Sequence, residues 1–166
     1  MRFPICNVCL KSEILCSACS ERISELGISK EEIEMYRKLY KALKGEKSLK
    51  DLEIKRIAGK NFIFIITKRG DAPKLIGKGG RIVKKIANVF KKPIRILEEP
   101  LDLRDFANNI FFTVPILGIN IEYKPHEEIY KIRIPKSERT KLPLSSDTFA
   151  NLSNSLLNLK VDVVFE

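Results

Sequence analysis

Tryptophan and glutamine are absent from this chain of 166 residues, and it contains a single histidine. No hydrophobic run has the length of a membrane span, and residues 1–10 lack the apolar stretch of a secretory signal. We therefore expect a cytoplasmic protein with no membrane partner. His126 lies in a predicted turn without a second histidine or a nearby pair of carboxylate and nucleophile, so we predict that the protein is not an enzyme and has no small-molecule substrate.

Acidic residues are the minority among the charged ones. Lys and Arg number 31 against 21 Asp and Glu, which gives a net charge of +10. Residues 68–95 contain ten Lys or Arg and one Asp, so most of the excess charge is local. A merely solvated basic surface would spread its charge more evenly, and no basic amphipathic helix has the aromatic face that seeks lipid. The charge therefore favours nucleic acid as the partner.

Cysteine does not occur after Cys19. The four cysteines form two CxxC pairs, Cys6 with Cys9 and Cys16 with Cys19, separated by six residues. A CxxC turn places two thiolates on one side of a bend, and two such turns complete a tetrahedral sulfur site. The alternatives are two disulfides, which a cytoplasmic protein disfavours, and an iron–sulfur cluster, which usually has other spacings. We predict one structural zinc ion with no open coordination position.

Apolar residues surround these cysteines. They would either dock the cysteine segment on the next domain or form a small core of their own. The residues concerned are Phe3, Ile5, Val8, Leu10, Ile14 and Leu15.

The stretch from Ile76 to Arg81 combines three glycines with a lysine. Such a turn lets the main chain approach a phosphate without intervening Cβ atoms, and it admits positive φ angles. Residues 81–90 have helical periodicity, so the turn also directs helical N–H groups toward an anion. It lacks the spacing of a P-loop and of a dinucleotide-binding fingerprint. The predicted nucleic-acid-binding residues are Lys74, Gly77, Lys78, Gly79, Gly80, Arg81, Lys84 and Lys85.

The elements around this turn follow the order α-β-β-α-α-β. Ser29 and Glu32 predict a capping box at the start of a helix that ends near Gly45, with Tyr36 and Tyr40 on its packed face. Two strands, a short helix, the glycine turn, a longer helix and a last strand follow. Their predicted ranges are 52–57, 62–67, 72–76, 77–80, 81–90 and 93–97.

Leu75-Ile76-Gly77-Lys78-Gly79-Gly80-Arg81-Ile82-Val83-Lys84-Lys85-Ile86 resembles the KH signature of the NusA-like transcription factors of archaea. The resemblance implies a prokaryotic (type II) KH domain, whose GxxG loop clamps about four nucleotides of single-stranded RNA. It implies a protein that binds single-stranded RNA and works with RNA polymerase in transcription elongation or termination. The alternatives are an accessory factor of ribosome assembly or RNA processing, with ribosomal components as partners, and a zinc-knuckle regulator that binds DNA.

Glycine is absent after Gly118, yet the pattern of residues 23–99 recurs in residues 100–166. The recurring elements are expected at 103–110, 117–123, 129–134, 136–142, 147–157 and 160–165. A shift of 67 positions aligns Ile82 with Phe149, but it replaces the glycine turn by residues 144–147. A helix N-cap at Ser146 or Asp147 would consume the free N–H groups, and the Asp would repel phosphate.

The chain as a whole is therefore expected to have an α+β fold with three parts. Residues 1–22 would form the four-cysteine zinc knuckle, and residues 23–99 a KH domain with an intact GxxG loop. Residues 100–166 would form a degenerate KH domain without that loop. This second copy would not clamp RNA backbone, and would instead extend the surface or bind a protein.

Overall fold

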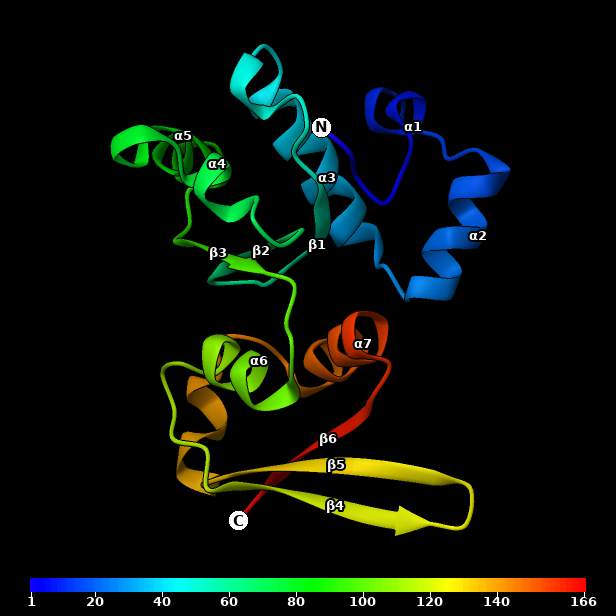
Figure 1. The fold of residues 1–166 in the computed structure, drawn as a ribbon, viewed down its shortest axis with the longest axis vertical. Helices are drawn as coiled ribbons and strands as arrows, with labels where there is room; N and C mark the ends of the chain where they lie inside the picture. The colour runs from blue at the N-terminus through cyan, green and yellow to red at the C-terminus, as the bar shows by residue number, and fades with distance from the viewer. The chain divides into compact units, whose positions relative to one another are not determined.

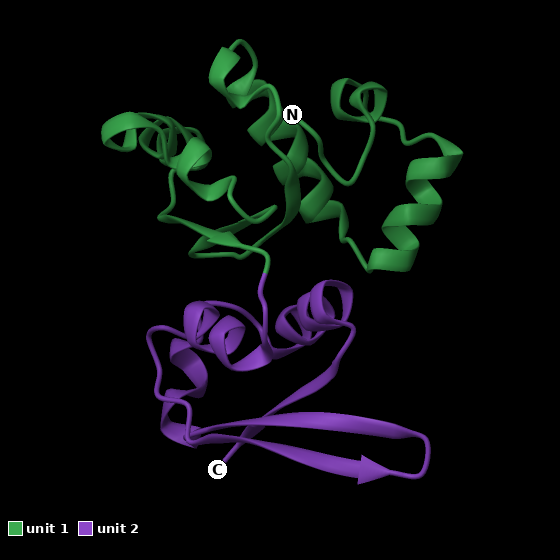
Figure 2. Ribbon diagram, viewed as in Figure 1, with its two compact units in different colours: residues 1–99 green, residues 100–166 purple.

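The structure is a computed structural model that describes residues 1–166, in two compact units, Met1–Glu99 and Pro100–Glu166 (Figures 1 and 2). Each unit combines helices with one three-stranded sheet, so the fold is mixed α+β, as predicted. None of the helices combines the length and the hydrophobicity that a membrane crossing requires.

The first unit is built around the sheet β1-β2-β3, in which β1 and β2 are antiparallel and β2 and β3 are parallel. Helices α3, α4 and α5 lie against this sheet (Figure 1). The elements in chain order are α1 (Asn7–Lys11), α2 (Ser17–Leu26), α3 (Lys30–Leu43), the 3-10 turn η1 (Lys47–Leu49), β1 (Ile54–Ala58), β2 (Ile63–Thr67), α4 (Ala72–Ile76), the 3-10 turn η2 (Lys78–Gly80), α5 (Arg81–Phe90) and β3 (Ile94–Glu98).

Helix α3 begins at the predicted residue, but the Glu32 side chain has other hydrogen-bond partners than predicted. The Ser29 side chain accepts a hydrogen bond from the Glu32 N–H at 3.2 Å, which confirms the N-cap. The second hydrogen bond of the predicted capping box, from the Ser29 N–H to the Glu32 carboxylate, does not form, so that part of the prediction was wrong. The Glu32 carboxylate is instead buried, and it accepts hydrogen bonds from Arg56 on β1, at 2.8 and 2.9 Å, and from the Tyr36 hydroxyl at 2.6 Å. A buried guanidinium offers a bidentate, charge-assisted partner that a single backbone N–H cannot match.

The cysteine segment belongs to the same compact unit as the sheet. Helix α2 runs without interruption through residues 22 and 23, where the sequence suggested a domain boundary. Ile5 and Leu10 are almost fully buried and join the core formed with α3. The Phe3 ring lies edge-on to that of Tyr36, with centroids 5.9 Å apart. The segment therefore docks on the unit through part of the predicted apolar set.

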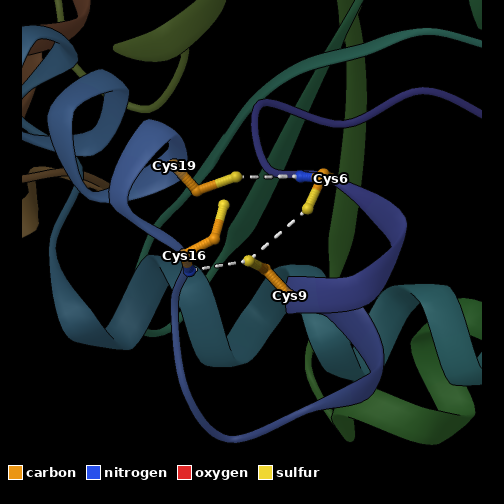
Figure 3. A group of neighbouring side chains, drawn as sticks. All are labelled: Cys6, Cys9, Cys16 and Cys19. Atoms are coloured by element: carbon orange, nitrogen blue, oxygen red, sulfur yellow. Dashed lines mark hydrogen bonds between the residues drawn. The ribbon is translucent and has the colours of Figure 1, made fainter.

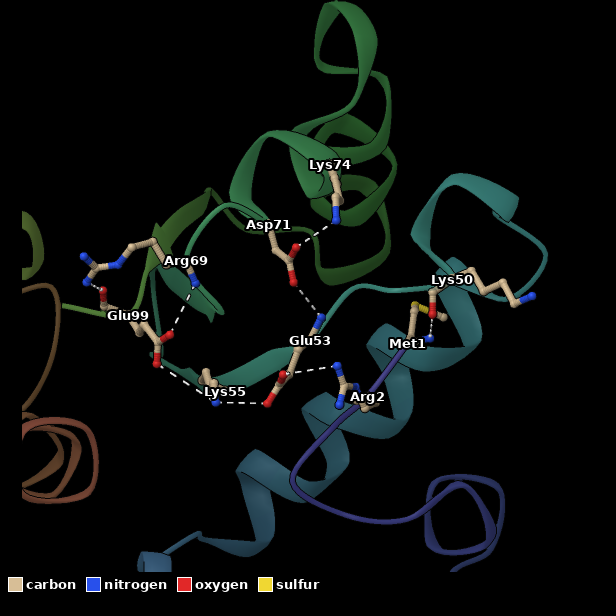
Figure 4. Close-up of polar contacts among 9 residues, drawn as sticks. All are labelled: Met1, Arg2, Lys50, Glu53, Lys55, Arg69, Asp71, Lys74 and Glu99. Atoms are coloured by element: carbon tan, nitrogen blue, oxygen red, sulfur yellow. Dashed lines mark hydrogen bonds and ion pairs between the residues drawn. The ribbon is translucent and has the colours of Figure 1, made fainter. Parts of the chain in front are cut away.

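Other members of that apolar set do not take part in docking, since Val8 and Ile14 are 71% and 80% exposed. The backbone supplies further contacts instead. The Arg2 N–H donates to Leu52 O at 2.7 Å, and the Met1 amino group donates to Lys50 O at 2.7 Å (Figure 4). These contacts attach the start of the chain to the segment that precedes β1.

The second unit repeats the topology of the first. Its sheet has the order β4-β5-β6, with β4 and β5 antiparallel and β5 and β6 parallel. The 3-10 turn η3 stands at the position of α4 in the chain order. The elements are α6 (Leu103–Ile110), β4 (Gly118–Lys124), β5 (Glu127–Ile134), η3 (Lys136–Lys141), α7 (Ser146–Leu157) and β6 (Lys160–Phe165).

The core of the second unit contains a cluster of phenylalanine rings. Phe149 of α7 stacks on Phe106 of α6 at a centroid distance of 5.1 Å and contacts Phe111 at 4.6 Å. Phe149 is fully buried, like Ile82, its counterpart in the sequence alignment of the two copies. The predicted N-cap of α7 was displaced, because Ser145, not Ser146 or Asp147, accepts the hydrogen bond from the Thr148 N–H.

Candidate nucleic-acid interface and metal site

The glycine turn joins α4 to α5 through backbone conformations that favour glycine. Gly77, Gly79 and Gly80 have φ angles of +78°, +64° and +74°. A Cβ on Gly77 would lie 2.8 Å from Ile82 Cγ1, whereas a Cβ on Gly79 would meet no atom within 4 Å. Gly77 therefore permits close packing beneath the turn, and the main chain at Gly79 is open to an approaching group.

The first turn of α5 has no capping side chain. Its N-cap is Gly80, and no acidic residue occurs in the first turn. By contrast, α7 at the corresponding place in the second unit is capped by Ser145 and has Asp147 in its first turn. The Gly80 N–H donates to Gly77 O at 3.1 Å and the Arg81 N–H donates to Lys78 O, so the N–H groups that follow Arg81, together with the helix dipole, are the ones that can attract an anion. This chemistry is available at α5 and is opposed at α7.

The predicted cations lie around this turn but differ in their partners. Lys78 and Lys84 are exposed and have no carboxylate partner. Arg81 and Lys85 both donate to Glu46, which precedes η1: two Arg81 nitrogens lie 3.0 and 3.1 Å from its carboxylate oxygens, and Lys85 Nζ lies 3.3 Å away. Hydrogen bonds from Arg81 and Lys85 lower the pKa of Glu46.

The fifth predicted cation, Lys74, is bound to Asp71 at the start of α4 (Figure 4). Asp71 accepts hydrogen bonds from Lys74 Nζ and from the Glu53 N–H, each at 3.0 Å. Burial alone would raise the pKa of Asp71, but these two donors outweigh it and the pKa is lowered. Asp71 thus attaches the helix before the glycine turn to the segment that leads into β1.

Sequence reasoning missed both carboxylates that organise this surface. Glu46 is the only acid between Lys44 and Lys50, and Asp71 is the only acid between Lys68 and Arg95. A lone acid in a basic stretch was the available signal. Its partner could not be deduced, because Glu46 lies 35 positions before Arg81.

The four cysteines lie together at the starts of α1 and α2 (Figure 3). Their sulfur atoms are all within 4.8 Å of one another. Cys6 and Cys16 precede α1 and α2, and Cys9 and Cys19 are buried within those helices. Zn–S bonds of about 2.3 Å in a tetrahedron would place the sulfurs about 3.8 Å apart. The geometry therefore fits a metal ion held by four thiolates.

Each CxxC pair also donates a backbone hydrogen bond to a sulfur atom of the other pair. The Cys6 N–H donates to Cys19 Sγ and the Cys16 N–H to Cys9 Sγ, each at 3.2 Å (Figure 3). Hydrogen bonding by the Cys9 backbone lowers the pKa of Cys6 to about 7, whereas burial raises the pKa of Cys19 to about 12. A bound cation would supply the positive charge that four adjacent thiolates require.

Comparison with known proteins places the chain near archaeal proteins of the NusA type. No family model matches it. It is 31% identical over 72 residues to a probable transcription termination protein NusA of Methanococcus vannielii, and the aligned region covers 43% of this chain and 42% of that protein. It is also 31% identical over 99 residues to a protein of the same name from Methanocaldococcus jannaschii, covering 59% of this chain and 52% of that protein.

The chain spans about half the length of these curated relatives. Among solved structures, the crystal structure of APE1850 aligns with 84% of this chain and with all of that chain, with a TM-score of 0.50 and 20% sequence identity. That likeness concerns the fold alone. The predicted resemblance is thus confirmed as a distant similarity to archaeal NusA-like proteins.

Proposed function

We propose that this chain is a non-catalytic protein that binds single-stranded RNA and acts in transcription. In this proposal both units are type II KH domains, formed by residues 23–99 and 100–166, and only the first grips RNA. The observation that carries the proposal is the contrast between the two copies. The first has an open glycine turn and an uncapped helix start, and the second has neither.

The grip would use backbone and side chains together. The main chain at Gly79 and the N–H groups of the first turn of α5 after Arg81 would contact one phosphate, and Lys78 and Lys84 would neutralise its neighbours. Such contacts supply affinity without sequence preference and weaken as salt increases. The apolar surface between α5 and the sheet edge would select bases.

The cysteine site would hold one structural Zn²⁺. Cys6, Cys9, Cys16 and Cys19 would occupy all four positions, so the ion would stabilise the docked segment and would take no part in a reaction. The two relatives named as probable transcription termination proteins support a role in transcription, and the resemblance to NusA-like factors implies RNA polymerase as the protein partner.

The first test is binding of labelled single-stranded RNA pools, followed by fluorescence anisotropy at two salt concentrations. The native chain is compared with the variant Lys78→Asp, Gly79→Asp, which places carboxylates in the turn. The matched control, Ser145→Asp with Ser146→Asp, adds carboxylates at the corresponding turn of the second unit, where Asp is a good N-cap. We expect loss of binding in the first variant and little change in the second. Unchanged binding by a folded Lys78→Asp, Gly79→Asp variant would refute a role for the glycine turn.

A second experiment addresses the cellular role. Co-purification with RNA polymerase subunits is expected. Co-purification with ribosomal particles alone would favour a role in ribosome assembly, and a preference for duplex DNA over single-stranded RNA would favour a DNA-binding regulator.

A further inference from the structure

Glu46 is the acid that binds the first turn of α5 directly after the glycine turn, and its contacts resemble those of a phosphate. Its two carboxylate oxygens accept one hydrogen bond each from the two terminal nitrogens of Arg81, at 3.1 and 3.0 Å. The same carboxylate accepts from Lys85 Nζ at 3.3 Å. Arginine binds phosphate oxygens through the same two-pronged arrangement. The carboxylate therefore holds the two cations as a phosphate would hold them.

The exposure of the three side chains shows which of them is accessible. The Glu46 side chain is 15% exposed, whereas those of Arg81 and Lys85 are 63% and 44% exposed. Both cations can thus be reached from solvent while they cover the carboxylate. A second anion can approach them without rearrangement of the helix.

The segment that holds Glu46 is itself basic. Lys44, Lys47 and Lys50 are exposed and surround Glu46 in the sequence, and the buried Leu49 anchors the segment. Removal of the carboxylate from the two cations would leave a surface of uniformly positive charge next to the glycine turn. Such a surface attracts polyanions and raises their local concentration.

We propose that Glu46 is an internal competitor of the RNA phosphate, which occupies Arg81 and Lys85 in the free protein and is displaced from them when the strand binds. This inference rests on the proposed function of the glycine turn. It assigns to Glu46 the role of limiting affinity at that site. It also means that Arg81 and Lys85, which an incoming phosphate can already approach, neutralise that phosphate fully only after Glu46 has released them.

The test is the variant Glu46→Gln, which keeps the size of the side chain and removes its charge. We expect the native RNA affinity to increase about two- to fivefold at low salt, the range that corresponds to loss of one surface ion pair. The plot of log K against log salt should become steeper, by up to about 0.7, because in the native protein the phosphate replaces a carboxylate that already neutralises these cations, whereas in the variant it meets cations without that partner.

The matched control is Glu138→Gln in the second unit. Glu138 pairs with Lys141 at 3.0 Å and its side chain is 19% exposed, so the substitution changes the net charge equally and breaks a similar ion pair. It should leave RNA affinity nearly unchanged. A gain of the same size in Glu138→Gln would mean that total charge alone is responsible, and this would overturn the inference.

A second background separates competition from structural support. In a chain that carries Arg81→Met and Lys85→Met, the substitution Glu46→Gln should no longer increase affinity. Weaker or unchanged binding by a folded Glu46→Gln protein would overturn the inference and leave the proposed function intact, provided that Lys78→Asp, Gly79→Asp still abolishes binding. If that loop variant retained the native affinity, the proposed function and the inference would both be overturned.

Discussion

Replacement of Arg56 by methionine should strongly lower the free energy of unfolding of the first unit. The side chains of Arg56 and Glu32 are only 3% and 6% exposed, and their closest nitrogen and oxygen atoms are 2.8 Å apart. Arg56→Met keeps most of the apolar volume but removes the guanidinium. The Glu32 carboxylate would then remain buried with only the Tyr36 hydroxyl and the Ile57 N–H as donors.

The expected cost follows from this geometry. Loss of one partner of a buried ion pair leaves an uncompensated charge and typically costs about 3–5 kcal/mol. A unit of this size should then melt at least about 10 °C lower. Glu32→Leu alone should cost a similar amount for the same reason. The double variant Glu32→Leu, Arg56→Met should cost less than the sum of the two, with a coupling of about 2–3 kcal/mol.

The assay must separate the two units, and the chain has no Trp to report on either. Hydrogen exchange read segment by segment, with urea unfolding followed by circular dichroism, gives the free energy of unfolding for the first unit. The control is Lys55→Met on the same strand, since Lys55 forms a partly exposed pair with Glu53 at 2.9 Å and should contribute less than about 1 kcal/mol. If Arg56→Met costs no more than Lys55→Met, the reasoning about the buried pair is refuted.

Three further predictions concern the sites themselves. Zinc binding should release protons and weaken as the pH falls, since a thiol such as Cys19, whose pKa is about 12, must lose its proton to bind. Chelator competition at two pH values measures the zinc affinity, and an affinity independent of pH would contradict this prediction. Asp71→Asn should lower the free energy of unfolding by about 1–2 kcal/mol at neutral pH. Because the pKa of Asp71 is lowered, this difference should disappear as the pH falls through its folded value, below 3.8, and urea titrations at neutral and acid pH would show whether it persists. Gly77→Ala should destabilise more than Gly79→Ala, because only the former brings a Cβ to 2.8 Å from a side chain; equal melting temperatures would contradict the packing argument.

The elements of the fold were largely predictable because their signals are local. Ser29 before an amphipathic run marks the start of α3, and glycines followed by helical periodicity mark the turn before α5. The cysteine cluster was predictable for the same reason, since two CxxC spacings carry their own geometry. In each case the residues that form the feature are close together in the sequence.

The remaining features depend on pairs that only tertiary structure brings together. The local sequence predicts Glu32 as a capping residue, yet its carboxylate binds Arg56, 24 positions later. Asp71 lies in a basic stretch of the sequence, yet it accepts a hydrogen bond from Glu53, 18 positions earlier. Charge and helix propensity alone allow several hydrogen-bond donors for each of these two carboxylates. The packing of β1 and the residue before it against the neighbouring elements determines which donor each carboxylate binds.

The two units together separate what the fold requires from what the proposed grip requires. Both have the same sheet topology and bury an apolar residue at the equivalent position of the last helix, Ile82 in one and Phe149 in the other. The second unit keeps this architecture with Ser145 as a helix cap in place of an open glycine turn. Burial and strand pairing are therefore sufficient for the topology, and the glycines are not needed for it. Gly77 has a packing reason, since a Cβ there would meet Ile82, but Gly79 has a positive φ angle with no atom near its Cβ position, and the proposed approach of RNA to the main chain would give it a reason.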